Sequence, residues 1–164
     1  MTAPHRLIDK QKSQSGFTLL EVLIALVILS VGLLGLAKMQ LNSIKFTNSA
    51  LLRSQAVFLA YDIFERMRAN RTMAVNGAYN TAFDTVVSSP PDCVSSTCST
   101  AQMVTFDLAQ WKSDLAALLP SGGGEITPIV AGGMEKLFTI SIRWDDERKN
   151  TVTAYKTFSL RSEI

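Results

Sequence analysis

The chain has 164 residues, 47% of them hydrophobic, which is enough for one domain with a modest core and a helix that lies outside it. Residues 1–16 carry the whole net charge of +2, so the remainder is neutral and lacks the basic character expected of a nucleic-acid-binding protein. Two cysteines and a single histidine, His5, leave almost nothing for a metal, a cofactor or a catalytic nucleophile–base pair.

The N-terminal region contains a polar leader followed by a long apolar segment. Residues 1–16 are polar and weakly basic, and residues 17–37 contain one charged side chain, that of Glu21. A helix over this segment is roughly 31 Å long, which is enough to cross the core of a bilayer. Because the basic residues precede the segment, the N-terminus is expected in the cytoplasm and the chain after Lys38 on the exported side.

Three interpretations of this segment compete. A secretory signal peptide has a shorter apolar stretch and an A-x-A-like cleavage site, which this segment lacks. A plain membrane anchor explains the length but not Glu21, because an ionisable group inside an apolar span is costly and usually functional. The motif Ser15-Gly16-Phe17-Thr18-Leu19-Leu20-Glu21 accounts for every feature, and it resembles the processing site of type IV prepilins and pseudopilins.

This resemblance implies how the N-terminus is processed and used. A prepilin peptidase would cut between Gly16 and Phe17 and methylate the new amine of Phe17. The carboxylate of Glu21 on a neighbouring subunit could then neutralise that amine, since a buried charge is tolerated only when it is paired. The subunit would be held in the lipid of the bacterial inner membrane by one span, and would then pass through the periplasm into an extracellular pilus.

The apolar helix is expected to continue beyond the membrane, because no proline lies between Phe17 and Met73. We assign residues 38–72 to its amphipathic half. Lys45 and Asn48 interrupt the apolar face, so packing against a domain is expected only from about Leu52 onward. The residues of that face are Leu41, Leu52, Ala56, Leu59, Ala60, Ile63 and Met67.

A second, narrower apolar stripe runs along the other side of this helix. Ile44, Leu51 and Phe58 recur every seven residues, and a helix of a monomer has no reason to be apolar on two sides. One hypothesis is that the stripe contacts other subunits in a filament. The alternative is that a loop of the same chain covers it.

The residues at the end of the long helix point to a particular family among the type IV pilins and pseudopilins. Residues 59–71 and 76–79 contain Ala-Asn-Arg and Asn-Gly-Ala-Tyr, and this stretch resembles the PilV family of minor pilins. The resemblance implies a subunit present in low amounts that joins other minor pilins, the major pilin and a tip adhesin-type protein to prime pilus assembly. Major pilins commonly carry a proline where this chain has Lys38, which argues against a major subunit.

Two rival functions share some of these features. A minor pseudopilin of a type II secretion system has the same N-terminal motif. A pilin that binds DNA or a host surface directly could use Arg66, Arg68 and Arg71 as a basic patch. However, Arg66 could equally pair with Asp62 at a spacing of i, i+4.

Residues 73–164 are expected to form the exported globular domain, beginning with a long surface connection over 72–101. Cys93 and Cys98 lie within this connection. On the exported side of the membrane they are expected to form a disulfide, which contributes roughly 2 kcal/mol for so short a loop. A redox-active or metal-binding pair is disfavoured, because the spacing is not C-x-x-C and no histidine is near.

The rest of the domain predicts a helix followed by three strands. The helix is expected over 106–119, capped by Thr105 and stopped by residues 120–124, with Trp111 as a core anchor. Its apolar residues are Val104, Leu108, Trp111, Leu115 and Leu118. Strands are predicted over 125–130, at an edge because of Pro128, and over 136–145 and 151–160, joined by the hairpin loop 146–150. The prediction is therefore an α+β, pilin-like fold, with a long helix packed on a small antiparallel sheet.

Overall fold

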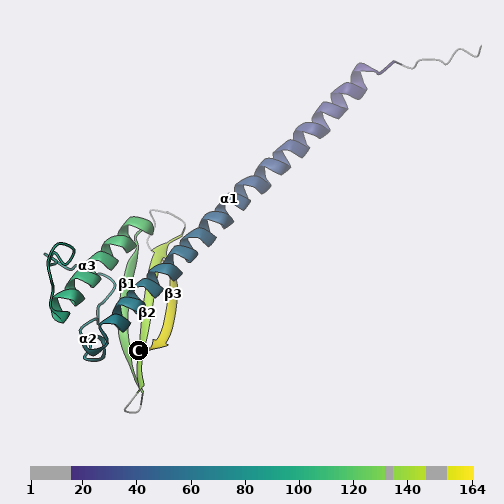
Figure 1. The fold of residues 1–164 in the computed structure, drawn as a ribbon. Helices are drawn as coiled ribbons and strands as arrows, with labels where there is room; N and C mark the ends of the chain where they lie inside the picture. The colour runs from purple at the N-terminus through teal and green to yellow at the C-terminus, as the bar shows by residue number, and fades with distance from the viewer. Residues whose placement is uncertain (1–15, 132–134, 147–154) are drawn as a thin grey trace, which may run out of the picture. The chain divides into compact units, whose positions relative to one another are not determined.

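The computed structural model describes residues 16–131, 135–146 and 155–164. Helices α1 (Leu19–Ala69), α2 (Arg71–Val75) and α3 (Thr100–Leu118) are followed by strands β1 (Gly123–Ala131), β2 (Glu135–Asp145) and β3 (Tyr155–Glu163) (Figure 1). The chain divides into two compact units, residues 1–44 and residues 45–164, and each is described by itself.

The described part of the first unit is the apolar beginning of α1. Among the described residues, α1 is the one helix that is long and apolar enough to cross a membrane, with a mean hydropathy of 2.7 in its most apolar window. Its large apolar side chains are exposed, as expected of a surface that faces lipid or other helices. The prediction of a single continuous helix is confirmed, although α1 ends at Ala69 and Asn70 separates it from α2.

In the second unit, one face of α1 packs into the core from Leu52 onward, as predicted. Its buried residues are Leu52, Ala56, Leu59, Ala60, Ile63, Phe64 and Met67. Phe64 is an addition to the predicted face, while Leu41, in the first unit, is exposed. This apolar face, more than intrinsic helix propensity, accounts for the stability of the second half of α1.

The predicted start of the second helix is wrong by six residues. Helix α3 begins at Thr100, within the segment expected to be a surface connection, and its cap is Ser99 instead of Thr105. Ser99 Oγ accepts from the backbone N–H of Gln102, and the Gln102 side chain accepts from the N–H of Ser99, which together form a capping box. At the other end Leu118 is exposed and Leu119 is buried in its place.

The three strands form one antiparallel sheet in the order β1-β2-β3. Pro128 lies on β1, which is an edge strand as predicted. β1 begins at Gly123 and β3 ends at Glu163, so both extend beyond their predicted limits. The predicted residues 147–154, which include most of the hairpin loop and the start of the third strand, lie outside the described residues.

The core of the second unit lies where α1, α3 and the inner face of the sheet meet (Figure 1). Alternate residues of β2 are buried there, namely Phe138, Ile140, Ile142 and Trp144. Trp111 is fully buried, and its Nε1 donates a 2.9 Å hydrogen bond to the carbonyl of Leu59, which confirms its role as a core anchor. The observed architecture is the predicted α+β fold.

Candidate functional site

The residues of the predicted cleavage site lie in an exposed segment immediately before α1. Gly16, Phe17 and Thr18 have no regular secondary structure, and the Phe17 side chain is 84% exposed. Thr18 caps the helix, because both its hydroxyl (3.3 Å) and its carbonyl (3.1 Å) accept from the N–H of Glu21. Gly16 and Phe17 are therefore both exposed and lie outside the helix.

Glu21 lies in the first turn of α1 and is exposed. Within the described part of the chain, its carboxylate has no hydrogen-bond or ion-pair partner. The N-terminus of the helix dipole favours a negative charge in this turn.

The predicted stripe on α1 is exposed. Ile44, in the first unit, is 66% exposed, and Leu51 and Phe58, in the second, are 54% and 72% exposed. Tyr61, one turn after Phe58, is half exposed as well. No described segment of the chain covers Leu51 or Phe58, so the alternative of an intrachain cover has no support among the described residues.

The predicted disulfide between Cys93 and Cys98 is present. Asp92, which precedes it, accepts hydrogen bonds from the backbone N–H groups of Val94 and Ser95, both at 3.1 Å. Ser99, the cap of α3, follows Cys98 directly. The disulfide loop is thereby joined to the start of a helix that carries part of the core.

A partly buried polar cluster that the sequence did not predict lies where α1 ends. We call it the helix-end cluster, and its residues are Arg66, Asn70, Tyr79 and Asp107. Tyr79 Oη donates a 2.6 Å hydrogen bond to Asp107, and Arg66 Nη1 lies 3.4 Å from the same carboxylate. Asn70 Nδ2 donates to the carbonyl of Thr100 at 2.8 Å and contacts Tyr79 Oη at 3.4 Å. The cluster joins the end of α1 to α3 and to the turn after α2.

Tyr79 and Asp107 are both buried, and their 2.6 Å hydrogen bond is the shortest contact of the cluster. Burial, followed by the hydrogen bond to Asp107, raises the pKa of Tyr79 well above its ordinary value. The turn that brings Tyr79 here contains Gly77 at φ = 80°, a backbone conformation that favours glycine. Arg66, Asn70 and Tyr79, all within residues 59–79, therefore build this cluster together with Asp107.

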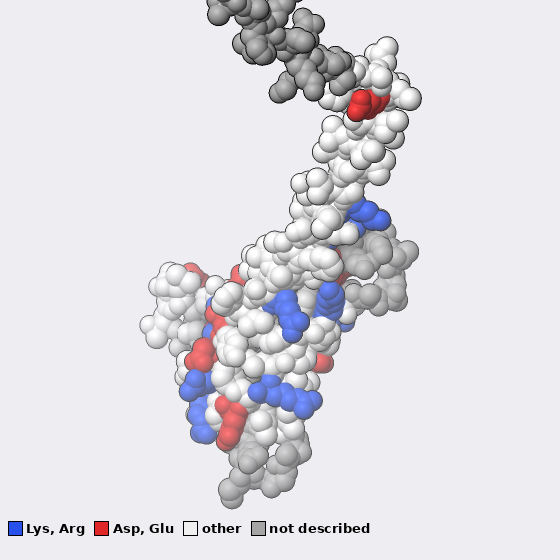
Figure 2. All heavy atoms as spheres, turned by 90° about the vertical axis from the view of Figure 1, so that its right-hand side faces the viewer, with Lys and Arg blue, Asp and Glu red and all other residues white. Residues whose placement is uncertain are grey.

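The arginines proposed as a basic patch are largely neutralised within the domain. Arg66 pairs with Asp62 at 2.9 Å, as anticipated, and Arg68 pairs with Glu65 at 3.0 Å. On the face shown in Figure 2, basic and acidic side chains are interspersed. This arrangement does not favour a site for a polyanion. Within the described ranges, no group of three or more histidine, cysteine or acidic side chains could hold a metal ion.

Comparison with known families gives two adjoining matches. Residues 11–37 match the family described as prokaryotic N-terminal methylation motif, and residues 38–109 match the family described as type IV pilin Tt1218. No curated protein and no solved structure matches the chain. The Tt1218 match begins at the end of the apolar segment and extends to residue 109, so it includes the whole helix-end cluster. Together the two matches support a type IV pilin subunit with a processed N-terminus.

Proposed function

We propose that this type IV pilin subunit is a minor pilin, similar to the PilV family. It would help to prime pilus assembly and would join the tip complex. The observation that carries the proposal is the coincidence of three features in one segment. They are an exposed Gly16–Phe17 bond, a Glu21 that has no partner among the described residues, and an uninterrupted apolar helix. The stretch from Arg66 to Tyr79 and Lys38 in place of a proline support the assignment to a minor subunit.

The proposed life cycle assigns a role to each part of the chain. Residues 1–16 are a cytoplasmic leader, and 17–37 span the inner membrane and later lie in the filament core. Residues 38–72 connect this span to the exported domain, 73–164. Prepilin peptidase removes the leader and methylates Phe17, and the carboxylate of Glu21 pairs with the amine of an adjacent subunit. The partners are other minor pilins, the major pilin and a tip adhesin-type protein.

Ile44, Leu51 and Phe58 are the proposed contact of α1 with other subunits. A stripe of three large, exposed apolar side chains, at heptad spacing, suits packing against another helix. A membrane-bound subunit would bring its lipid-facing segment and this stripe into the filament together. Association would then bury the apolar surface that the second unit exposes in isolation.

Deletion of the gene tests the proposal against its nearest rival. A minor pilin predicts loss or strong reduction of surface pili with normal secretion of type II substrates. A minor pseudopilin predicts the reverse, namely intact pili and lost secretion. Complementation with the chain carrying Glu21→Gln is expected to fail in either system, because the amine of the neighbouring subunit would lack its counter-charge.

A pilin that binds DNA or a host surface directly is the second candidate. Arg71 is exposed and, within the described residues, lacks an ion-pair partner. Of the three arginines, it is therefore the one available to bind an acidic ligand. Reversing the charge of Arg68 and Arg71, which lie outside the helix-end cluster, should abolish capture while pili persist if the candidate is correct. Loss of pili, or unchanged capture, would contradict it.

A further inference from the structure

The outer edge of β1 is closed by residues from the rest of the domain. The N–H and C=O of Ile126 are hydrogen-bonded to Thr81, at 2.9 and 3.2 Å, so they point away from β2. Because these directions alternate along a strand, the backbone groups of Gly124 and Pro128 face the same outer edge. The C=O of Gly124 accepts from Lys112 Nζ at 2.6 Å, and Pro128 has no N–H to offer.

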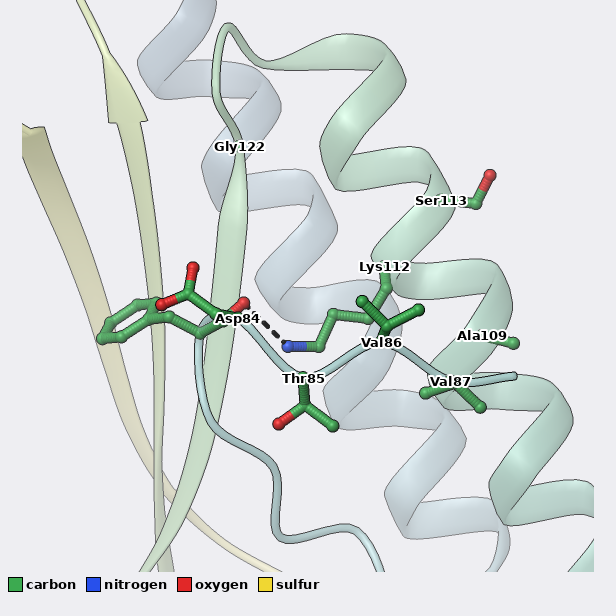
Figure 3. A pocket seen from close by; sticks show the side chains of 9 residues that line it. Asp84, Thr85, Val86, Val87, Ala109, Lys112, Ser113 and Gly122 are labelled. Atoms are coloured by element: carbon green, nitrogen blue, oxygen red, sulfur yellow. Dashed lines mark hydrogen bonds between the residues drawn. The ribbon is translucent and has the colours of Figure 1, made fainter.

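The segment that covers this edge, residues 81–84, is held by two cations, and we call it the strap. From α3, Lys112 Nζ donates to the carbonyls of Ala82 and Phe83, the latter at 3.2 Å. Figure 3 shows the Lys112 side chain reaching from α3 toward this segment. From β2, the Arg143 guanidinium pairs with Asp84 and lies 4.6 Å from the centre of the Phe83 ring. The strap is fixed from two separate elements.

We propose that the strap closes the β1 edge against pairing with a strand of another chain, and that the Lys112 ammonium holds it closed. An ammonium has three N–H donors, and here three backbone carbonyls, two from the strap and one from β1, converge on it. Ala82 and Asp84 are exposed, so the strap has little apolar burial of its own to fix it. Burial lowers the pKa of Lys112, while the nearby carboxylates of Asp84 and Glu125 favour its charged form.

The opposite edge of the sheet provides an internal comparison. By the same alternation, the backbone groups of Tyr155, Thr157, Ser159, Arg161 and Glu163 face outward from β3. In the described part of the chain, none of them has a backbone partner on that side. Charged side chains on β3 are the usual protection of an open edge. Edge protection therefore differs between the strands: a cation-held strap on β1, and charge on β3.

Hydrogen exchange of the full chain in detergent micelles, measured by NMR, tests the proposal. Lys112→Met keeps the length of the side chain but removes the charge and the donors. The amides of Thr81 and Ile126 should exchange about tenfold faster or more, while Ile140 in the middle of the sheet keeps its protection. Lys156→Met, which removes a lysine that pairs with Asp146 on the open side, is the control and should leave Thr81 unchanged. Unchanged exchange at Thr81 and Ile126 in Lys112→Met would overturn the proposal.

Chemical rescue keeps the test decisive if Lys112→Met does not fold. Lys112→Ala leaves a gap beside a hollow of about 430 Å³ that Val86, Val87 and Ser113 also line, so a small amine can enter (Figure 3). n-Propylammonium should restore protection of Thr81, and tetramethylammonium, which lacks N–H donors, should not. Equal effects of the two ions would overturn the role of Lys112.

A separate measurement, the fraction of oligomers, tests whether the strap prevents β1 from pairing with a strand of another chain. In Lys112→Met, or in Lys112→Ala without amine, analytical ultracentrifugation should detect a larger fraction of oligomers than in the wild type. n-Propylammonium should reverse the increase in Lys112→Ala. If Thr81 exchanges freely but the oligomer fraction does not change, the strap does not guard the edge.

Discussion

At Gly124, Trp111 and Leu115 leave no room for a side chain. A Cβ atom there would lie 2.3 Å from Trp111 Cη2 and 2.6 Å from Leu115 Cδ1. Gly124→Ala should lower the free energy of unfolding by about 1–3 kcal/mol, because a well-packed core must shift to accept the methyl group. Denaturation in urea would measure the change.

The adjacent glycine is a matched control. A Cβ at Gly123 would meet Arg143 Nε and the carbonyl of Phe83 at 3.4 Å, which is ordinary contact. Gly123→Ala should therefore change stability little, and equal losses for the two variants would refute this account of the packing.

The hydrogen bond between Tyr79 and Asp107 is the second feature that can be tested at a single residue. Tyr79→Phe removes the hydroxyl and leaves a buried carboxylate oxygen without that partner, which should cost about 1–3 kcal/mol. Tyr155→Phe, at a half-exposed tyrosine, is the control and should cost almost nothing. Comparable losses in the two variants would contradict the assigned bond.

The same tyrosine predicts a pH dependence. The pKa of Tyr79 is raised in the folded state above its ordinary value of 10.0, so its hydroxyl stays protonated after the unfolded chain has begun to ionise. The contribution of the Tyr79 hydroxyl to the free energy of unfolding is complete below pH 10, and it is lost as the pH rises from there toward the raised pKa. The difference in unfolding free energy between the wild type and Tyr79→Phe should therefore shrink above pH 10. A constant difference would show that Tyr79 titrates normally.

The helix-end cluster could not be predicted from the sequence. Arg66, Tyr79 and Asp107 are far apart along the chain, and no local pattern in the sequence relates them to one another. The contact Arg66–Asp62, at a spacing of four residues, was open to prediction because helical geometry alone brings such residues together. Tertiary polar contacts have no comparable periodic signal.

At the scale of elements, the disulfide should stabilise the start of α3. Replacing both Cys93 and Cys98 by alanine should cost about 2 kcal/mol, since the closed loop is short. Hydrogen exchange should accelerate most in residues 100–103, because Ser99 follows Cys98 and Asn70 anchors Thr100. A loss of protection spread evenly over β2 would contradict a local role.

Element types were easier to predict than element ends. The alternation on β2 and the proline on β1 were sufficient to place a central and an edge strand. The start of α3 was missed because Ser99 and Gln102 form a capping box within a segment rich in serine and threonine, where such residues are usually read as loop. Gly123 and Gly124 were read as a helix stop, yet they begin β1, where close packing requires at least the second of them.

The stripe on α1 predicts a defect in assembly without a defect in folding. Phe58→Asp should change the stability of the isolated subunit by only about 0.5 kcal/mol, because the side chain is 72% exposed. It should strongly reduce incorporation into pili, measured by immunoblot of sheared filaments against whole cells. Leu118→Asp, at an exposed leucine of α3, is the control. Normal incorporation of the Phe58 variant would remove the stripe from the proposed interface.

At the scale of the whole molecule, the proposed function requires two units that are suited to different environments. The first unit exposes large apolar side chains that suit lipid or a bundle of helices, and the second has its own core and interspersed surface charges. The general layout was open to prediction because a long apolar run and a cleavage motif are local features. Position in the pilus and the choice of partners depend on surfaces of other chains.

The most direct test of the central claim is mass spectrometry of the chain recovered from sheared pili. The proposed function predicts a polypeptide that begins at Phe17, carries one methyl group on its amine, and is far less abundant than the major subunit. A chain that begins at Met1, a cut at another bond, or absence from purified pili would contradict the claim.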